Sequence, residues 1–192
     1  MKLDTLLKKA LFLEYLTIGW NVFEGISCVA VGFITGSISL TAYGLESSIE
    51  VFASSVVVWE LRSPKRSKKR EERAVKLIGI AYLIVSTYIF IDGSESLIAG
   101  HHPQRSFIGI ILLTVTLFMM LGLGFFKRFV GKKMKSVTVL ADAKFTLIDA
   151  ALSSTVLVGL IFNTFFGWWW MDQAMALFLS GVAFREGLRE VL

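Results

Sequence analysis

The feature that most constrains this chain is a series of long apolar segments. A helix that spans a membrane needs about 20 consecutive, mostly apolar residues. Six segments meet that requirement, over residues 12–34, 40–61, 74–99, 107–126, 137–162 and 168–188. Hydrophobic residues make up 55% of the 192 positions, which is typical of an integral membrane protein. We therefore expect an all-α membrane protein, with residues 1–192 forming a single transmembrane domain of six helices.

The distribution of cations predicts the topology. Residues 62–73 and 127–135 are densely basic, and several lysines precede the first apolar segment. The other connections carry almost no charge. Because cytoplasmic connections are enriched in Lys and Arg, we expect cytoplasmic N- and C-termini in a multi-pass protein of the cell (inner) membrane. The alternative, nucleic-acid binding by these basic segments, is disfavoured because cytoplasmic loops have this composition without binding nucleic acid.

Two carboxylates in the second apolar segment need an explanation. Glu46 and Glu50 are four residues apart, so on a helix they lie on one face and repel each other. No Lys or Arg in the same span is placed to neutralise them. A charged side chain within a bilayer is costly and is usually functional. The pair becomes favourable if a divalent cation or a proton binds there, and Asp149 of the fifth segment could complete such a site.

An internal repeat connects the second and fifth segments. When residues 42–58 are placed over residues 141–157, Glu50 falls on Asp149 and several Ala, Ile and Ser residues coincide. Phe145 takes the place of Glu46. Transporters are often built from repeats with the substrate site between them. Small residues in both segments predict a close approach of the two helices.

These segments resemble the cation diffusion facilitator family. The resemblance rests on "SISLTAYGLESSIEVFASSVVVWELR", "LADAKFTLIDAALSSTVLVGL" and "WWWMDQAMALFLSGVAFREGLREV", which are similar to its second, fifth and sixth spans. In that family the second and fifth spans each carry two metal ligands four residues apart. The resemblance implies a six-helix bundle, exchange of divalent cations for protons, and a homodimer. We expect a short form that lacks the family's cytoplasmic C-terminal domain.

The resemblance also implies a ligand set. Glu46 and Glu50 stand at the second-span ligand positions, and Asp149 stands at the last ligand position of the fifth span. Asp142 is the aspartate of the Ala-Asp-Ala motif at the start of the fifth span. In the family this residue usually supports the ligands, and we include it here as a residue that could also bind the metal. Phe145 stands where the family places His or Asp and cannot bind a metal ion. The predicted site therefore has three carboxylates, completed by water or by Asp142.

The phrase "GWNVFEG" in the first span resembles a short branch of the same family. It suggests that Asn21 and Glu24 support the metal ligands without binding the metal directly. The alternative is a polar hydrogen bond between helices. His101 and His102 follow the third span, and we interpret them as solvated residues of an outer loop.

The predicted function is membrane transport of a divalent metal cation. Carboxylate oxygens suit Mn, Mg, Fe(II) and, less selectively, Zn. We expect metal and protons as substrates, no permanently bound cofactor, and no enzymatic activity. Two alternatives remain open at this point: a metal-binding membrane protein that does not transport, and an intramembrane metal-dependent transferase.

Overall fold

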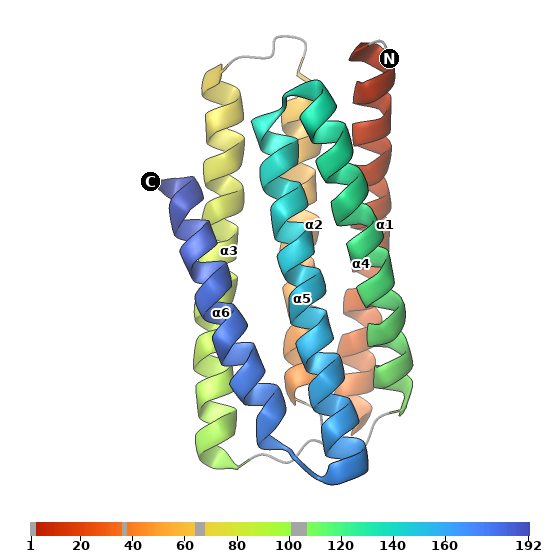
Figure 1. The fold of residues 1–192 in the computed structure, drawn as a ribbon, viewed down its shortest axis with the longest axis vertical. Helices are drawn as coiled ribbons and strands as arrows, with labels where there is room; N and C mark the ends of the chain where they lie inside the picture. Colours follow the sequence, from red (N-terminus) through yellow and green to blue (C-terminus); the bar gives the residue numbers. More distant parts are fainter. Residues whose placement is uncertain (1–2, 36–37, 64–67, 101–106) are drawn as a thin grey trace.

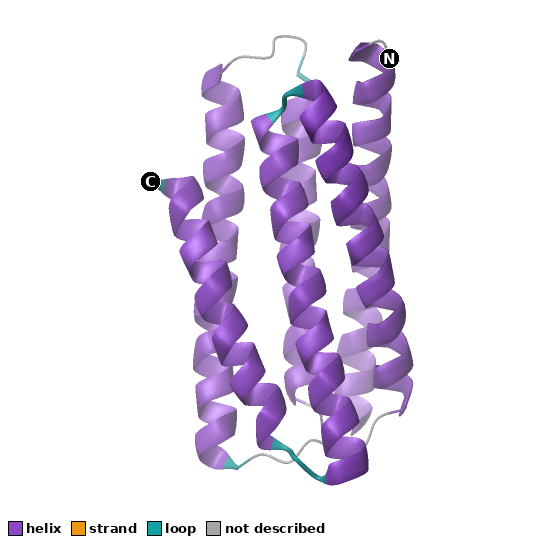
Figure 2. Cartoon of the chain, viewed as in Figure 1, coloured by secondary structure: helices purple, strands orange, loops and turns teal. Residues whose placement is uncertain are grey.

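The computed structural model describes residues 3–35, 38–63, 68–100 and 107–192. Within these residues the chain forms helices and no β-strand, as Figure 2 shows. The expected all-α fold is confirmed. The helices are α1 (Leu3–Thr35), α2 (Ile38–Leu61), α3 (Lys68–Ala99), α4 (Phe107–Met134), α5 (Val137–Phe166) and α6 (Trp170–Val191).

Several helices extend beyond the apolar segments that predicted them. Helix α1 begins at Leu3, and α3 begins at Lys68 inside the basic segment that the sequence analysis treated as a loop. Helix α4 continues through the second basic segment to Met134. Lys, Arg and Glu are good helix formers, so a helix does not end where its apolar residues end. Among the described residues, four helices are long and apolar enough to cross a membrane: α1, α3, α4 and α5. The six-span count and the cytoplasmic termini remain predictions.

The bundle places both basic segments at the same end. In Figure 1 the N-terminus, the start of α3 and the turn between α4 and α5 lie together at the top. The C-terminus lies in the same half of the molecule, and the turn between α5 and α6 lies at the opposite end. This arrangement agrees with the topology predicted from the cations, because all the densely basic parts that are described face one side.

Three antiparallel helix pairs make the most extensive contacts: α1 with α2, α4 with α5, and α3 with α6. Glycines allow some of these close approaches. A methyl group on Gly44 of α2 would lie 2.8 Å from the Gly25 carbonyl oxygen of α1, and one on Gly79 of α3 would lie 3.0 Å from the Gly187 oxygen of α6. Helices α2 and α5 do contact each other, but less extensively than each contacts its own partner. The close packing predicted for α2 and α5 is therefore found mainly in other pairs.

Aromatic residues gather where α5 turns into α6. Gly167 ends α5 in the left-handed conformation, with a φ of 72°, which favours glycine. Trp168 stacks on Phe162 and on Trp170, with ring centroids 5.6 and 6.5 Å apart. These rings lie at the end of the bundle opposite the N-terminus, where an outer aromatic belt is expected. His101 and His102 lie outside the described residues.

Candidate cation site

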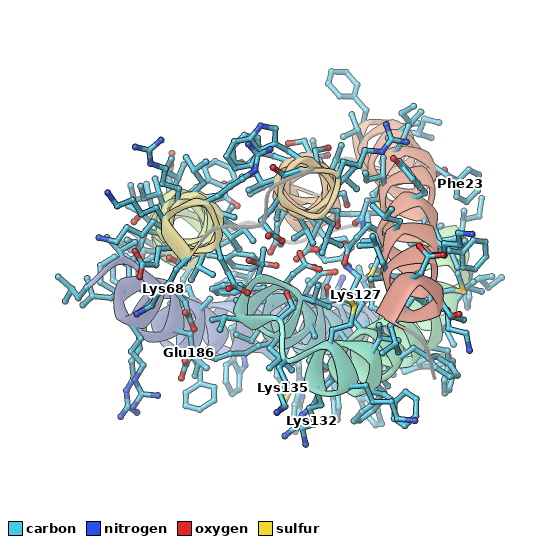
Figure 3. All side chains as sticks on the ribbon, turned by 90° about the horizontal axis from the view of Figure 1, so that it is seen from above. Phe23, Lys68, Lys127, Lys132, Lys135 and Glu186 are labelled. Carbon is cyan, nitrogen blue, oxygen red and sulfur yellow. The ribbon has the colours of Figure 1, made fainter. Side chains whose placement is uncertain are left out.

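The interior of the bundle contains a buried lysine. Lys127 of α4 is fully buried, and its Nζ atom lies 2.5 Å from Oδ2 of Asp142 and 2.9 Å from Oε2 of Glu14. Figure 3 shows Lys127 within the bundle, whereas Lys132 and Lys135 point away from it. The composition of residues 127–135 predicts that Lys127 belongs to a cytoplasmic basic segment. That assignment was wrong for this residue, because α4 continues past it and turns its side chain inward.

Lys127 joins four helices. Its ammonium group donates to Thr146 Oγ1 of α5 at 3.4 Å and to Ser54 Oγ of α2 at 3.5 Å, in addition to the carboxylates on α1 and α5. Ser54 lies one helical turn from Glu50, so the positive charge also acts on that carboxylate. Within the second span no Lys or Arg can neutralise Glu46 and Glu50. The structure supplies one from α4.

Glu50 and Asp149 are the most isolated carboxylates of the predicted ligand set. Each is only 2% exposed, and they lie in each other's electrostatic field from α2 and α5. Neither oxygen of Glu50 has a hydrogen-bond partner, and Asp149 Oδ2 has none. A buried carboxylate without a partner is costly, so these two groups favour a positive ligand.

Glu46 and Asp142 both act electrostatically on this pair. Glu46 is 6% exposed and lies in the field of Glu50, as its spacing on α2 predicts. Asp142 gives one oxygen to Lys127 and leaves Oδ1 without a partner. Among the described residues, no three His, Cys, Asp or Glu side chains are close enough together to hold a metal ion. A metal site shared by these carboxylates therefore stays a prediction.

Phe145 fills the position of the missing fourth ligand. Its side chain is fully buried and stacks on Tyr82 of α3, with ring centroids 3.8 Å apart. The ring belongs to the apolar core beside α2 and α3. The position that carries a ligand in the related family thus serves packing in this chain.

A second polar group lies further along α1. Glu24 is fully buried, and neither of its oxygens has a hydrogen-bond partner. Three polar side chains from different turns and helices surround it: Trp20, Tyr43 and Thr116. Glu24 also lies in the electrostatic field of Glu46 and Asp149, which connects it to the predicted ligands.

Asn21 lies one turn from Glu24. Its Nδ2 atom donates to the Thr17 carbonyl oxygen within α1 at 3.0 Å, while its Oδ1 atom has no partner. The hydrogen bond that its amide nitrogen makes is thus internal to α1 and not between helices. Whether Asn21 and Glu24 support a bound metal stays a prediction.

The sequence contains a signal that could have identified Lys127. Gly124 and Gly131 stand three residues before and four residues after it, and small residues are typical of helix faces that pack closely in membranes. Such spacing places a residue on the same helical face as its neighbours. An α4 extended through the cations would have turned Lys127 toward the interior.

These features define a class of protein: a multi-pass helical membrane protein whose interior carries unpartnered carboxylates beside a buried lysine. The profile of the cation efflux transmembrane domain matches residues 16–192. The chain belongs to the cation efflux family, and the resemblance found in the sequence is confirmed. Members of this family are transporters and not enzymes, which removes the intramembrane transferase alternative.

Individual relatives are distant. The cation-efflux pump FieF of Klebsiella pneumoniae (strain 342) is 26% identical over 77% of this chain and 51% of its own length. An uncharacterised transporter of Methanocaldococcus jannaschii is 27% identical over 88% of this chain and 64% of its own. The cadmium, cobalt and zinc/H(+)-K(+) antiporter of Bacillus velezensis is 25% identical over 94% and 59%. The chain thus spans about half to two thirds of the length of these relatives.

Proposed function

We propose that this chain transports a divalent metal cation across the membrane in exchange for protons, through carboxylates of α2 and α5. The observation that carries the proposal is the pair Glu50 and Asp149, which are buried on α2 and α5. Both oxygens of Glu50 and the Oδ2 atom of Asp149 have no hydrogen-bond partner. Membership of the cation efflux family supports a cation as substrate. The name of the Bacillus relative, a zinc/H(+)-K(+) antiporter, supports exchange for protons.

The chemistry follows from charge balance. Glu46, Glu50 and Asp149 would be the ligands, and their oxygens suit Mn, Fe(II) and Zn. When the metal leaves, the same carboxylates would take up protons, because buried like charges without a counter-ion are unfavourable. Protons would leave again as the next metal ion enters. Metal ions and protons thus compete for the same carboxylates. If the bundle opened alternately to each side of the membrane, this competition would exchange metal for protons.

Lys127 would act as a fixed counter-ion beside the ligands. It pairs with Glu14 and Asp142, and its single charge balances one of these two carboxylates, so a proton on the other would complete the neutralisation. Glu50, Asp149 and Glu46 form no ion pair with Lys127, so most of the unbalanced negative charge lies on them. In this arrangement Asp142 supports the site through Lys127, and its predicted part as a ligand would be secondary.

Transport is tested by metal-dependent proton flux in proteoliposomes. The wild-type chain is expected to carry Mn²⁺ or Zn²⁺ inward against an outward proton flux. The double substitution Glu50→Gln with Asp149→Asn is expected to abolish both fluxes. The matched control is Glu95→Gln, which neutralises an exposed carboxylate on α3 and should leave both fluxes unchanged. Undiminished flux in the double variant would remove the proposal.

A second candidate function is metal binding without transport, and Phe145 favours it. A ring stacked on Tyr82 stands where the family places a ligand, so the site has fewer donors than a transporter of the family would have. Metal binding that depends on Glu50, measured together with absence of flux through the wild-type chain, would support this candidate. The homodimer that the family implies, and the inner-membrane location expected from the sequence, remain parts of the main proposal.

A further inference from the structure

A groove of about 570 Å³ runs along the outside of the bundle between α4, α5 and α6. Its two ends differ in chemistry. Arg128, Lys132 and Lys144 line the end nearer to the basic segments together with one carboxylate, Glu186. Leu147 and Val182 lie among the apolar residues toward the membrane interior. The groove therefore has a cationic head and an apolar floor.

The charges at the head are not all balanced within the protein. Lys144 pairs with Glu186 and Glu190 of α6. Arg128 and Lys132 are exposed, and neither has an ion-pair partner among the described residues. Lys132 and Glu186 lie on the same outer side of the bundle in Figure 3. Two uncompensated cations thus stand at the mouth of an apolar groove.

We propose that this groove binds an anionic phospholipid of the leaflet that faces the basic end of the bundle. The phosphate would lie between Arg128 and Lys132, and an acyl chain would follow Leu147 and Val182 toward the middle of the bilayer. Basic pockets between transmembrane helices on the cytoplasmic side bind anionic headgroups in this way. We infer a lipid because the groove combines cations at one end with apolar residues along its length. A free phosphate ion would bind the cations but would leave the apolar part of the groove unoccupied.

The groove is separate from the carboxylates proposed to carry metal. The inward face of α5 presents Asp149, which is buried, whereas Lys144 and Ala151 belong to the outward groove. The lipid site does not rest on the transport proposal and can be tested without metal.

The test is native mass spectrometry of the purified chain with phosphatidylglycerol or phosphatidylcholine added. The wild-type chain is expected to retain phosphatidylglycerol in preference to phosphatidylcholine. Arg128→Gln with Lys132→Gln is expected to weaken phosphatidylglycerol binding roughly 30-fold, since each basic residue near the surface contributes to the attraction. The matched control, Lys9→Gln with Lys76→Gln, removes two exposed cations of α1 and α3 and should bind like the wild type.

Two further variants separate the head of the groove from its floor. The exchange Arg128→Lys with Lys132→Arg keeps both charges and should preserve lipid retention. Ala151→Phe should fill the apolar floor and reduce retention, whereas Ala30→Phe, at an exposed alanine of α1, should not. Equal retention of the two lipids by the wild type would overturn the proposal. The proposal would also be overturned if the wild type formed a dimer without retaining lipid and Ala151→Phe dissociated that dimer. A second copy of the chain would then occupy the groove.

Discussion

The Nζ atom of Lys127 lies 2.5 Å from Oδ2 of Asp142, which is 15 positions further along the chain and on the next helix. With Glu14 at 2.9 Å on the other side, the ammonium group connects α1, α4 and α5 in a region with no solvent exposure. The charge of a single residue therefore holds together elements from both halves of the chain.

Substituting Lys127 by Met should destabilise the protein strongly. The change leaves Glu14 and Asp142 buried without their counter-ion, and breaking a buried ion pair from one side costs about 3–5 kcal/mol. The free energy of unfolding can be measured by SDS titration in mixed micelles. Lys132→Met, at an exposed position of the same helix, is the control and should have little effect.

The triple change Glu14→Gln, Lys127→Met and Asp142→Asn should recover most of that loss, because no uncompensated charge remains. If Lys127→Met unfolds at the same SDS fraction as the wild type, the ion pairs do not contribute to stability as argued.

Substituting Phe145 by Asp should strengthen metal binding while weakening the fold. The aspartate would complete two acids four residues apart on α5, and more ligand charge raises cation affinity, here by about tenfold. The lost stack on Tyr82 leaves a cavity, and removal of a buried Phe side chain typically costs about 3–5 kcal/mol. Equilibrium dialysis with Mn²⁺ measures the affinity. Phe145→Leu removes the ring without adding a ligand, so a gain of affinity in that variant would contradict the explanation.

Substituting Gly44 by Ala should separate α1 from α2. The new methyl group would lie 2.8 Å from both the Gly25 carbonyl oxygen and the Val29 backbone nitrogen, so the helices must move apart at a cost of about 1–3 kcal/mol. Gly122→Ala in α4 is the matched control, because nothing lies within 4 Å of its added methyl group. That variant should be neutral or slightly more stable, since Ala is the better helix former. Equal thermal midpoints for the two variants would exclude close packing at Gly44.

Substituting Glu24 by Gln should weaken metal binding moderately. Glu24 lies in the field of Glu46 and Asp149 and is not one of the predicted ligands, and loss of a supporting group typically costs about tenfold in affinity. Calorimetric titration with Mn²⁺ measures the change, with Glu95→Gln as a control far from the site. A loss as large as that caused by Glu50→Gln would instead make Glu24 a ligand.

Much of the fold could be predicted from apolar segments alone. The length of each segment fixes a helix because the bilayer leaves no other way to satisfy the backbone. The helix ends could not be predicted in this way. The last turns of α4 are basic, and a composition-based reading ends the helix at Phe126 instead of Met134.

The candidate site was predicted in part, for a physical reason. The spacing of Glu46 and Glu50 fixes their shared face, because it depends only on the helix period. The partner of Asp142 could not be found by local spacing, since Lys127 comes from a different helix and depends on how α4 packs against α5. The packing of Phe145 against Tyr82 is equally non-local and joins α5 to α3.

The buried position of Lys127 also has a consequence for biosynthesis. Of the two carboxylates that form ion pairs with Lys127, only Glu14 precedes it in the chain, whereas Asp142 follows on α5. An ammonium group without a partner in lipid is costly. We therefore expect Glu14, already placed on α1, to favour the insertion of α4.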